Sequence, residues 1–334
     1  MAYASRQWSY LLGTLGAVLQ VVAGWWDVYS HLIFGSTDPW WNPAHLTLYA
    51  GIAIVIFAVW RGLRVKAVQP GYATSPIHFA NTSGLKLAGL GSVMQIIAGV
   101  WNEVVHHIFL SEPKIAPAHA LLTLGMLTIN LGLIVGLSIE YGMIKQKILS
   151  VSSWRRYVIV LCMILVFSSI WLAAAGAFIY VARSFWTDPL GWTMAMLLAT
   201  VGPLVFAPAK RVLPQFGTGI AIGLTFNLVA FFFLVAYAET PAYVPWGIVP
   251  VVLLDTLVVG LKRVLGLTRA VTIASTVPGL LFPLTYFPFT SYLFSWSFTA
   301  QLPLLMVFFG AVLGVMLGNR VYASISSLVL GNIS

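Results

Sequence analysis

The sequence predicts an all-α fold, a polytopic membrane helix bundle of about ten transmembrane helices built from helical-hairpin repeats. Its 334 residues are 60% hydrophobic and only 7% charged, whereas soluble domains carry about 25% charged residues. Apolar runs of about 20 residues recur along the chain, and this is the length that crosses a bilayer as a helix. The net charge of +9 does not indicate a nucleic-acid partner, because its distribution follows the membrane segments.

Ten apolar segments are expected to span the membrane, at residues 9–34, 44–62, 85–110, 118–142, 155–182, 191–208, 216–238, 245–266, 269–293 and 302–320. All 17 basic residues except Lys114 and Arg183 lie at the chain ends or beside the connections that follow the even-numbered spans. Basic residues gather on the cytoplasmic side of a membrane. Both termini of this cell-membrane protein are therefore predicted to be cytoplasmic. Tryptophans typical of a membrane interface lie on the opposite side: Trp40, Trp41, Trp186, Trp192, Trp246 and Trp296.

A repeated pattern divides the chain. Residues 15–31, "LGAVLQVVAGWWDVYSH", match residues 90–106, "LGSVMQIIAGVWNEVVH", and each is followed by Pro-Ala-His, at 43–45 and 117–119. Apolar letters match easily by chance in membrane segments, but the shared Gln, Trp and His positions do not. We infer a duplicated helical hairpin in one orientation over residues 1–145, followed by a membrane scaffold over residues 146–334.

Each hairpin concentrates polar residues near the predicted outer side. Asp27 and His31 are four residues apart and therefore share a helix face, and His45 follows a proline that suits the first turn of the next helix. Carboxylate and imidazole groups are common ligands for zinc, iron and copper. Ionisable groups are expensive in a membrane, so function is their default explanation. The candidate ligands are Asp27, His31, His45, Glu103, His106, His107 and His119.

Two other interpretations of these residues stay open. They can cap helix ends and bind interfacial water, as a single histidine at a helix end usually does. A haem held between the repeats, for example by His31 and His106, is a further alternative. A haem held by His31 and His45 on one long helix is not expected, because Pro39 and Pro43 interrupt that helix.

The first hairpin resembles the metal-binding segment of the C subunit of copper-containing membrane monooxygenases, the particulate methane and ammonia monooxygenase family. The resemblance rests on Asp27, His31 and the Pro-Ala-His at 43–45, followed by Tyr49 and Gly51. It implies that Asp27, His31 and His45 bind a metal, generally taken to be copper, within the membrane near its outer side. It covers about 30 residues per copy, and ten spans exceed what that subunit has.

The second hairpin departs from this pattern. Asn102 stands where the first copy has Asp27, and a neutral amide is a poor ligand for such metals. Glu103 lies about 100° around the helix from Asn102 and shares a face with His107 instead of His106. We therefore expect the second hairpin to bind metal more weakly or through Glu103, His107 and His119, unless both hairpins converge on one site.

Three functions fit these features. The first is a metal-bearing membrane subunit of an oxidoreductase or monooxygenase complex, with lipid, other membrane subunits and outer-side redox subunits as partners and quinol as a candidate reductant. The second is a non-catalytic anchor subunit of a respiratory or haem-containing complex. The third is an ion or metal transporter, for which Asp255 and Glu140 are the best candidate residues. Copper is the expected cofactor, with zinc, iron and haem as alternatives.

Overall fold

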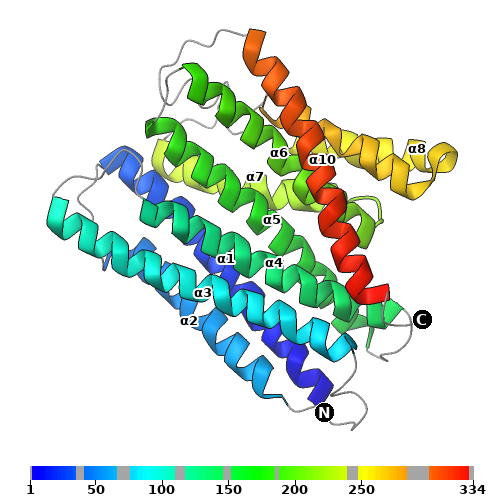
Figure 1. Cartoon of the computed structure of the whole chain (residues 1–334), viewed down its shortest axis with the longest axis horizontal. Coiled ribbons are helices and arrows are strands. Elements are labelled where there is room, and N and C mark those ends of the chain that lie inside the picture. Colours follow the sequence, from blue (N-terminus) through cyan, green and yellow to red (C-terminus); the bar gives the residue numbers. More distant parts are fainter. Residues whose placement is uncertain are drawn as a thin grey trace. The chain divides into compact units, whose positions relative to one another are not determined.

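The computed structural model describes residues 2–34, 41–65, 76–109, 117–145, 152–184, 188–238, 247–283 and 301–330. These ranges are helical apart from short turns and contain no strand, so the predicted all-α class is confirmed. The helices are α1 (Ala2–Phe34), α2 (Pro43–Arg64), α3 (Pro76–Phe109), α4 (Pro117–Lys145), α5 (Ser153–Ser184), α6 (Asp188–Val212), α7 (Thr218–Ala238), α8 (Ile248–Ala274) and α10 (Gln301–Leu330) (Figure 1).

Six of the described helices are long and apolar enough to cross a membrane, namely α1 to α5 and α10. The apolar stretch Thr218–Phe232 of α7 is shorter than this length. The prediction of a membrane helix bundle is thus supported at this coarser level. In α8 the basic residues Lys262, Arg263 and Arg269 interrupt the apolar run, which is one physical reason why fewer than ten helices qualify.

The chain divides into two compact units. The first comprises Met1–Ala173 with Ser324–Ser334, and the second comprises Ala174–Ala323. The first unit contains α1 to α4 complete, together with most of α5. The compact units therefore divide within α5, whereas the sequence pattern placed a division after residue 145.

The two hairpins of the first unit pack in the same way. Helix α1 lies along α2, and α3 lies along α4 (Figure 1). A Cβ atom at Gly16 would lie 2.7 Å from the carbonyl oxygen of Gly51, and one at Gly91 would lie 2.6 Å from that of Gly125. Glycines at these positions let the backbones approach closely, as small residues do between membrane helices. The sequence repeat is thus also a repeat of helix contacts.

A hydrogen bond across the first unit ties the first hairpin to α5. The Trp25 indole Nε1 donates to the carbonyl oxygen of Leu172 at 2.8 Å, and the Trp25 side chain is buried. A buried indole N–H requires a partner, and this one fixes the end of α1 that carries Asp27.

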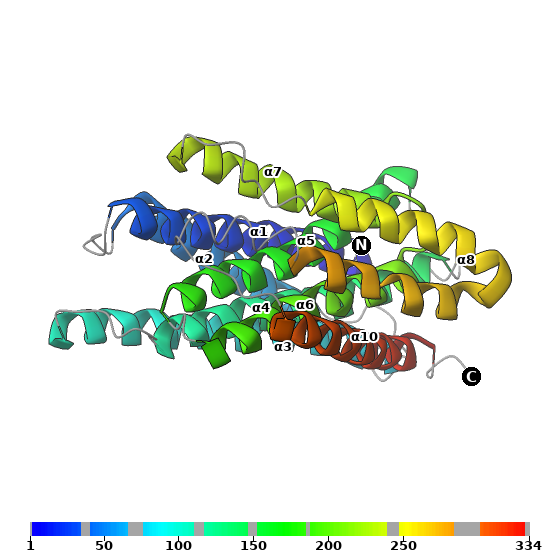
Figure 2. The same cartoon turned by 90° about the horizontal axis from the view of Figure 1, so that it is seen from above.

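The second unit contains a sharp break within α8. Gly266 has φ 76° and ψ 161°, a backbone conformation that residues with a side chain rarely adopt. Figure 2 shows the chain turning back on itself there. The sequence pattern placed the end of one span at residue 266 and the start of the next at 269, which coincides with this break.

Candidate functional site

The structure brings Asp27 of α1 and His45 of α2 into direct contact. The His45 Nε2 atom lies 2.9 Å from Asp27 Oδ1, and both side chains are 17% exposed. The sequence placed both residues in one candidate metal site, and the contact shows that α1 and α2 present them to the same point.

The start of α2 explains why His45 faces α1. The Asn42 side chain caps the helix by accepting a hydrogen bond from the His45 backbone N–H at 2.7 Å, and Pro43 occupies the first helical position. An amide cap and a proline at this position are both favourable at a helix start. The sequence Asn-Pro-Ala-His thus fixes the backbone from which the imidazole projects.

The remaining histidines of the candidate site are only partly described. His31, His106 and His107 lie in α1 and α3, but their side chains are outside the described residues. Within the described part of the chain, no group of three or more His, Cys, Asp or Glu residues is placed to hold a metal ion. A complete ligand shell therefore stays a prediction, and what the structure shows is the contact between Asp27 and His45.

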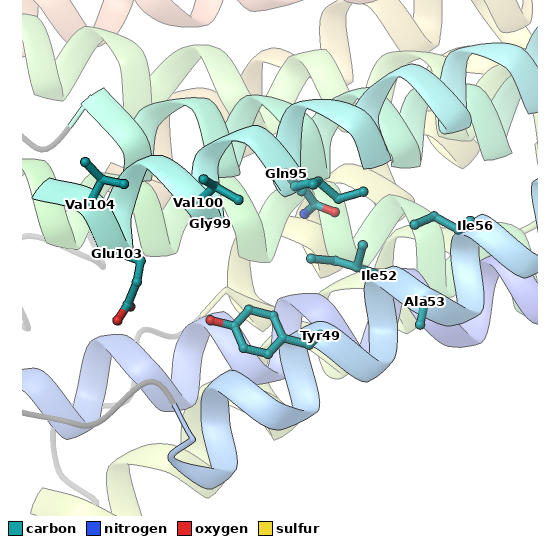
Figure 3. A pocket seen from close by; sticks show the side chains of 10 residues that line it. Tyr49, Ile52, Ala53, Ile56, Gln95, Gly99, Val100, Glu103 and Val104 are labelled. Atoms are coloured by element: carbon teal, nitrogen blue, oxygen red, sulfur yellow. The ribbon is translucent and has the colours of Figure 1, made fainter. Parts of the chain in front are cut away.

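In the second hairpin, α4 starts at Pro117 and His119 is partly buried in its first turn, as His45 is in α2. Glu103 instead lines a pocket between α2 and α3, together with Tyr49 (Figure 3). Asn102 is partly buried one residue before it. Successive residues of a helix point about 100° apart, so Asn102 and Glu103 lie on different faces of α3.

The pocket between α2 and α3 has a volume of about 640 Å³, is open to the surface of the helices and is mostly apolar. Its lining comprises Tyr49, Ile52, Ala53, Ile56, Gln95, Ile96, Gly99, Val100, Glu103 and Val104. The Tyr49 hydroxyl and the Glu103 carboxylate lie at one end and the Gln95 amide lies further along α3 (Figure 3). Sequence reasoning missed this pocket. The small residues Ala53 and Gly99 line it, but nothing in the sequence shows that they lie on facing helices.

Tyr49 connects the pocket with the Asp27–His45 pair. Its ring centroid lies 6.3 Å from that of His45, with the planes at 33°. The phenol is also close enough to interact electrostatically with the carboxylates of both Glu103 and Asp27. The polar residues of the first hairpin and Glu103 of the second therefore belong to one neighbourhood.

Asp255, the strongest candidate for a transport role, has a structural explanation. The Lys210 Nζ atom lies 2.5 Å from Asp255 Oδ1, and the two side chains are 1% and 0% exposed. Asp255 Oδ2 accepts hydrogen bonds from the backbone N–H groups of Gly217 and Ile220, both at 3.0 Å, and Lys210 Nζ donates to the Gln215 carbonyl oxygen at 2.7 Å. These bonds clamp the α6–α7 connection and the start of α7 to α8.

No known protein family, characterised protein or solved structure matches this chain. The resemblance of the first hairpin to the monooxygenase C subunit therefore stays an expectation. What the chain does must be argued from its own residues.

Proposed function

We propose that this protein is an integral membrane, metal-binding subunit of an oxidoreductase complex, with copper held by Asp27, His31 and His45 near the outer side of α1 to α4. The observation that carries the proposal is the contact of 2.9 Å between Asp27 Oδ1 and His45 Nε2. Because His31 lies one helical turn after Asp27, it shares the face of α1 that meets His45.

The spacing of the two donor atoms suits a metal ion. Bonds of about 2.1 Å from an ion to both atoms are compatible with their separation of 2.9 Å, and the angle at the ion would be close to 90°. A tetrahedral ion would hold two donors about 3.4 Å apart at the same bond length. The observed 2.9 Å is also the length of an ordinary hydrogen bond, so it brings the two donor atoms together without selecting copper over zinc. Copper held there would supply one-electron redox chemistry.

The second hairpin is proposed to bind metal weakly or to contribute to the first site. Asn102 removes the anionic ligand that Asp27 supplies in the first copy, and Glu103 points into the pocket beside Tyr49. The candidate ligands there are Glu103, His106, His107 and His119.

The number of spans, the orientation and the partners are proposed from the distribution of apolar and basic residues along the chain. We propose ten spans, cytoplasmic termini and a location in the cell membrane, with redox partners on the outer side and within the bilayer. A non-catalytic anchor subunit is the alternative. The transporter hypothesis ranks third, because the bonds that Asp255 makes explain that residue without an ion path.

Metal analysis of the purified protein tests the proposal. The wild type should retain copper with an electron paramagnetic resonance signal typical of nitrogen ligation, and His45→Ala or Asp27→Ala should lose it. Thr47→Ala is the matched control, since its hydroxyl bonds only to the Pro43 carbonyl oxygen of its own helix. Copper that survives both ligand substitutions, or a wild type that binds no metal after reconstitution, would contradict the assignment.

A further inference from the structure

A second, smaller pocket lies near the starts of α1 and α5. It has a volume of about 120 Å³, and Gln7, Trp154 and Arg155 are among the residues that line it. The apolar spans of the two helices are Arg6–Asp27 and Ser153–Gly176, so this α1–α5 pocket lies at one surface of the membrane. Drug-sized molecules occupy sites of about 300–1,000 Å³, so the pocket suits a single compact group.

The start of α5 concentrates positive charge beside this pocket. Arg155 and Arg156 are both exposed in the first turn of α5, which contains no acidic residue. No Asp or Glu occurs in residues 1–26 or 141–187. Glu140, the acid that precedes α5, is 1% exposed and is not among the residues that line the pocket. The N-terminus of a helix is the positive end of its dipole and disfavours cations, so an anion in the pocket would stabilise this helix start.

The backbone at this helix start supplies hydrogen-bond donors as well. The Arg156 backbone N–H donates to the Ser152 carbonyl oxygen at 3.3 Å, which makes it the first N–H of α5 with an acceptor one turn earlier. The N–H groups that precede it have no acceptor within the helix. Donors of this kind, together with the helix dipole, bind phosphate and other anions.

Gln7 of α1 is a further polar group at the pocket. It lines the pocket, its side chain is 8% exposed, and its amide nitrogen has no hydrogen-bond partner among the described residues. A half turn of the terminal amide group exchanges its oxygen and nitrogen with little change of shape. Either atom can therefore face a ligand, and an anion would draw the N–H groups towards itself.

Exposed tryptophans show where the pocket lies in the membrane. Trp8 and Trp154 line it from the two helices and are 56% and 74% exposed. Indoles at the ends of membrane helices lie at the level of the lipid headgroups. The remaining lining of Leu11, Val158 and Ile159 is apolar. The surroundings therefore suit a ligand that joins an anionic group to hydrocarbon chains.

We propose that the α1–α5 pocket binds the phosphate group of an anionic phospholipid, held by Arg155, the Gln7 amide and the start of α5. The acyl chains would extend into the bilayer beside Leu11 and Val158. With the proposed orientation the lipid belongs to the cytoplasmic leaflet, where basic pockets between membrane helices bind anionic headgroups. A free phosphate ion is the competing source of the same group. The inference needs the membrane location of the helices and does not depend on the metal.

Native mass spectrometry of the delipidated full chain in detergent tests the inference. The probes are dioleoyl phosphatidylglycerol and dioleoyl phosphatidylcholine, which has the same acyl chains and a phosphate but no net charge. The wild type should bind one phosphatidylglycerol about tenfold more tightly than phosphatidylcholine, as expected for charge-assisted hydrogen bonds. Arg155→Gln and Gln7→Leu should each remove most of that preference. Arg156→Gln is the matched control, since Arg156 is the next residue, is also exposed and does not line the pocket.

Three outcomes would overturn the assignment. The first is equal affinity for the two lipids. The second is an Arg156→Gln variant that loses as much of the preference as Arg155→Gln, because the lipid would then respond to charge and not to the pocket. The third is inorganic phosphate that displaces phosphatidylglycerol and raises the unfolding temperature as much, which would assign the site to a soluble ion. If Gln7→Leu unfolds, the comparison of Arg155→Gln with Arg156→Gln still decides, because both side chains are exposed.

Discussion

Replacing Asp255 by Asn should strongly destabilise the second compact unit. The substitution keeps the shape of the side chain and an oxygen that can accept from the backbone N–H groups of Gly217 and Ile220. It removes the negative charge beside Lys210, whose side chain is 1% exposed. The lysine would then keep only the Gln215 carbonyl oxygen among the partners described above.

The size of the expected destabilisation follows from the burial of the Lys210 side chain. Removing one partner of a buried ion pair costs about 3–5 kcal/mol, because the other charge is left without compensation away from water. We expect Asp255→Asn to lie near the lower end, at about 3 kcal/mol, since the N–H groups at the start of α7 remain paired. Lys210→Met should cost a similar amount. The double variant should cost only about 1 kcal/mol, because it buries no charge.

The assay is unfolding in mixed micelles, with the free energy of unfolding measured for the wild type, both single variants and the double variant. Thr256→Ala is the control, since this exposed hydroxyl, one residue after Asp255, bonds only to its own helix. A free energy for Asp255→Asn within about 0.5 kcal/mol of wild type would refute the reasoning. So would a double variant whose loss equals the sum of the two single losses, because the pair would then not be coupled.

Three further predictions concern the first unit. Gly16→Ala should destabilise by about 1–3 kcal/mol in the same unfolding assay, because its methyl group would meet the α2 backbone. Gly99→Ala should be neutral or slightly stabilising, because nothing lies within 4 Å of a Cβ atom added there. Equal losses of stability for the two variants would contradict the packing argument. A cysteine at Trp41, which is 58% exposed, should react with an impermeant thiol reagent from outside, and one at Ser152 only after the inner side is opened. The single native cysteine is buried, and the reverse labelling would overturn the topology. Asn102→Asp should raise the metal stoichiometry or affinity if the second hairpin is a degenerate site. No change, together with loss of metal on Glu103→Gln, would favour a site at Glu103, and no change from either substitution in a protein that retains its metal would mean that this hairpin binds none.

The sequence predicted features that depend on local chemistry or on the repeat. Pro43 and Pro117 begin helices as expected, because proline suits the first helical position. The approach of His45 to Asp27 was predicted from the hairpin that joins their helices. The expectation of ten spans is not confirmed, since six described helices qualify.

Features that depend on contacts between helices far apart in sequence could not be predicted. The pocket requires Ala53 and Gly99 to face each other across α2 and α3, which no periodicity along one helix specifies. In the sequence Asp255 was a candidate transport residue because no partner was evident. Its partner, Lys210, lies on another helix, and the sequence alone does not show that the two side chains meet.

The bond from Trp25 to Leu172 also sets an order of events during synthesis. Its two residues are 147 positions apart in the chain, whereas Asp27 and His45 belong to a hairpin whose contacts are local. At about 5–20 residues per second, translation of the intervening chain takes roughly 7 to 30 seconds. The first hairpin can therefore insert and bring Asp27 to His45 well before α5 arrives to secure α1. A metal ion delivered in that interval would meet the two proposed ligands on a nascent chain.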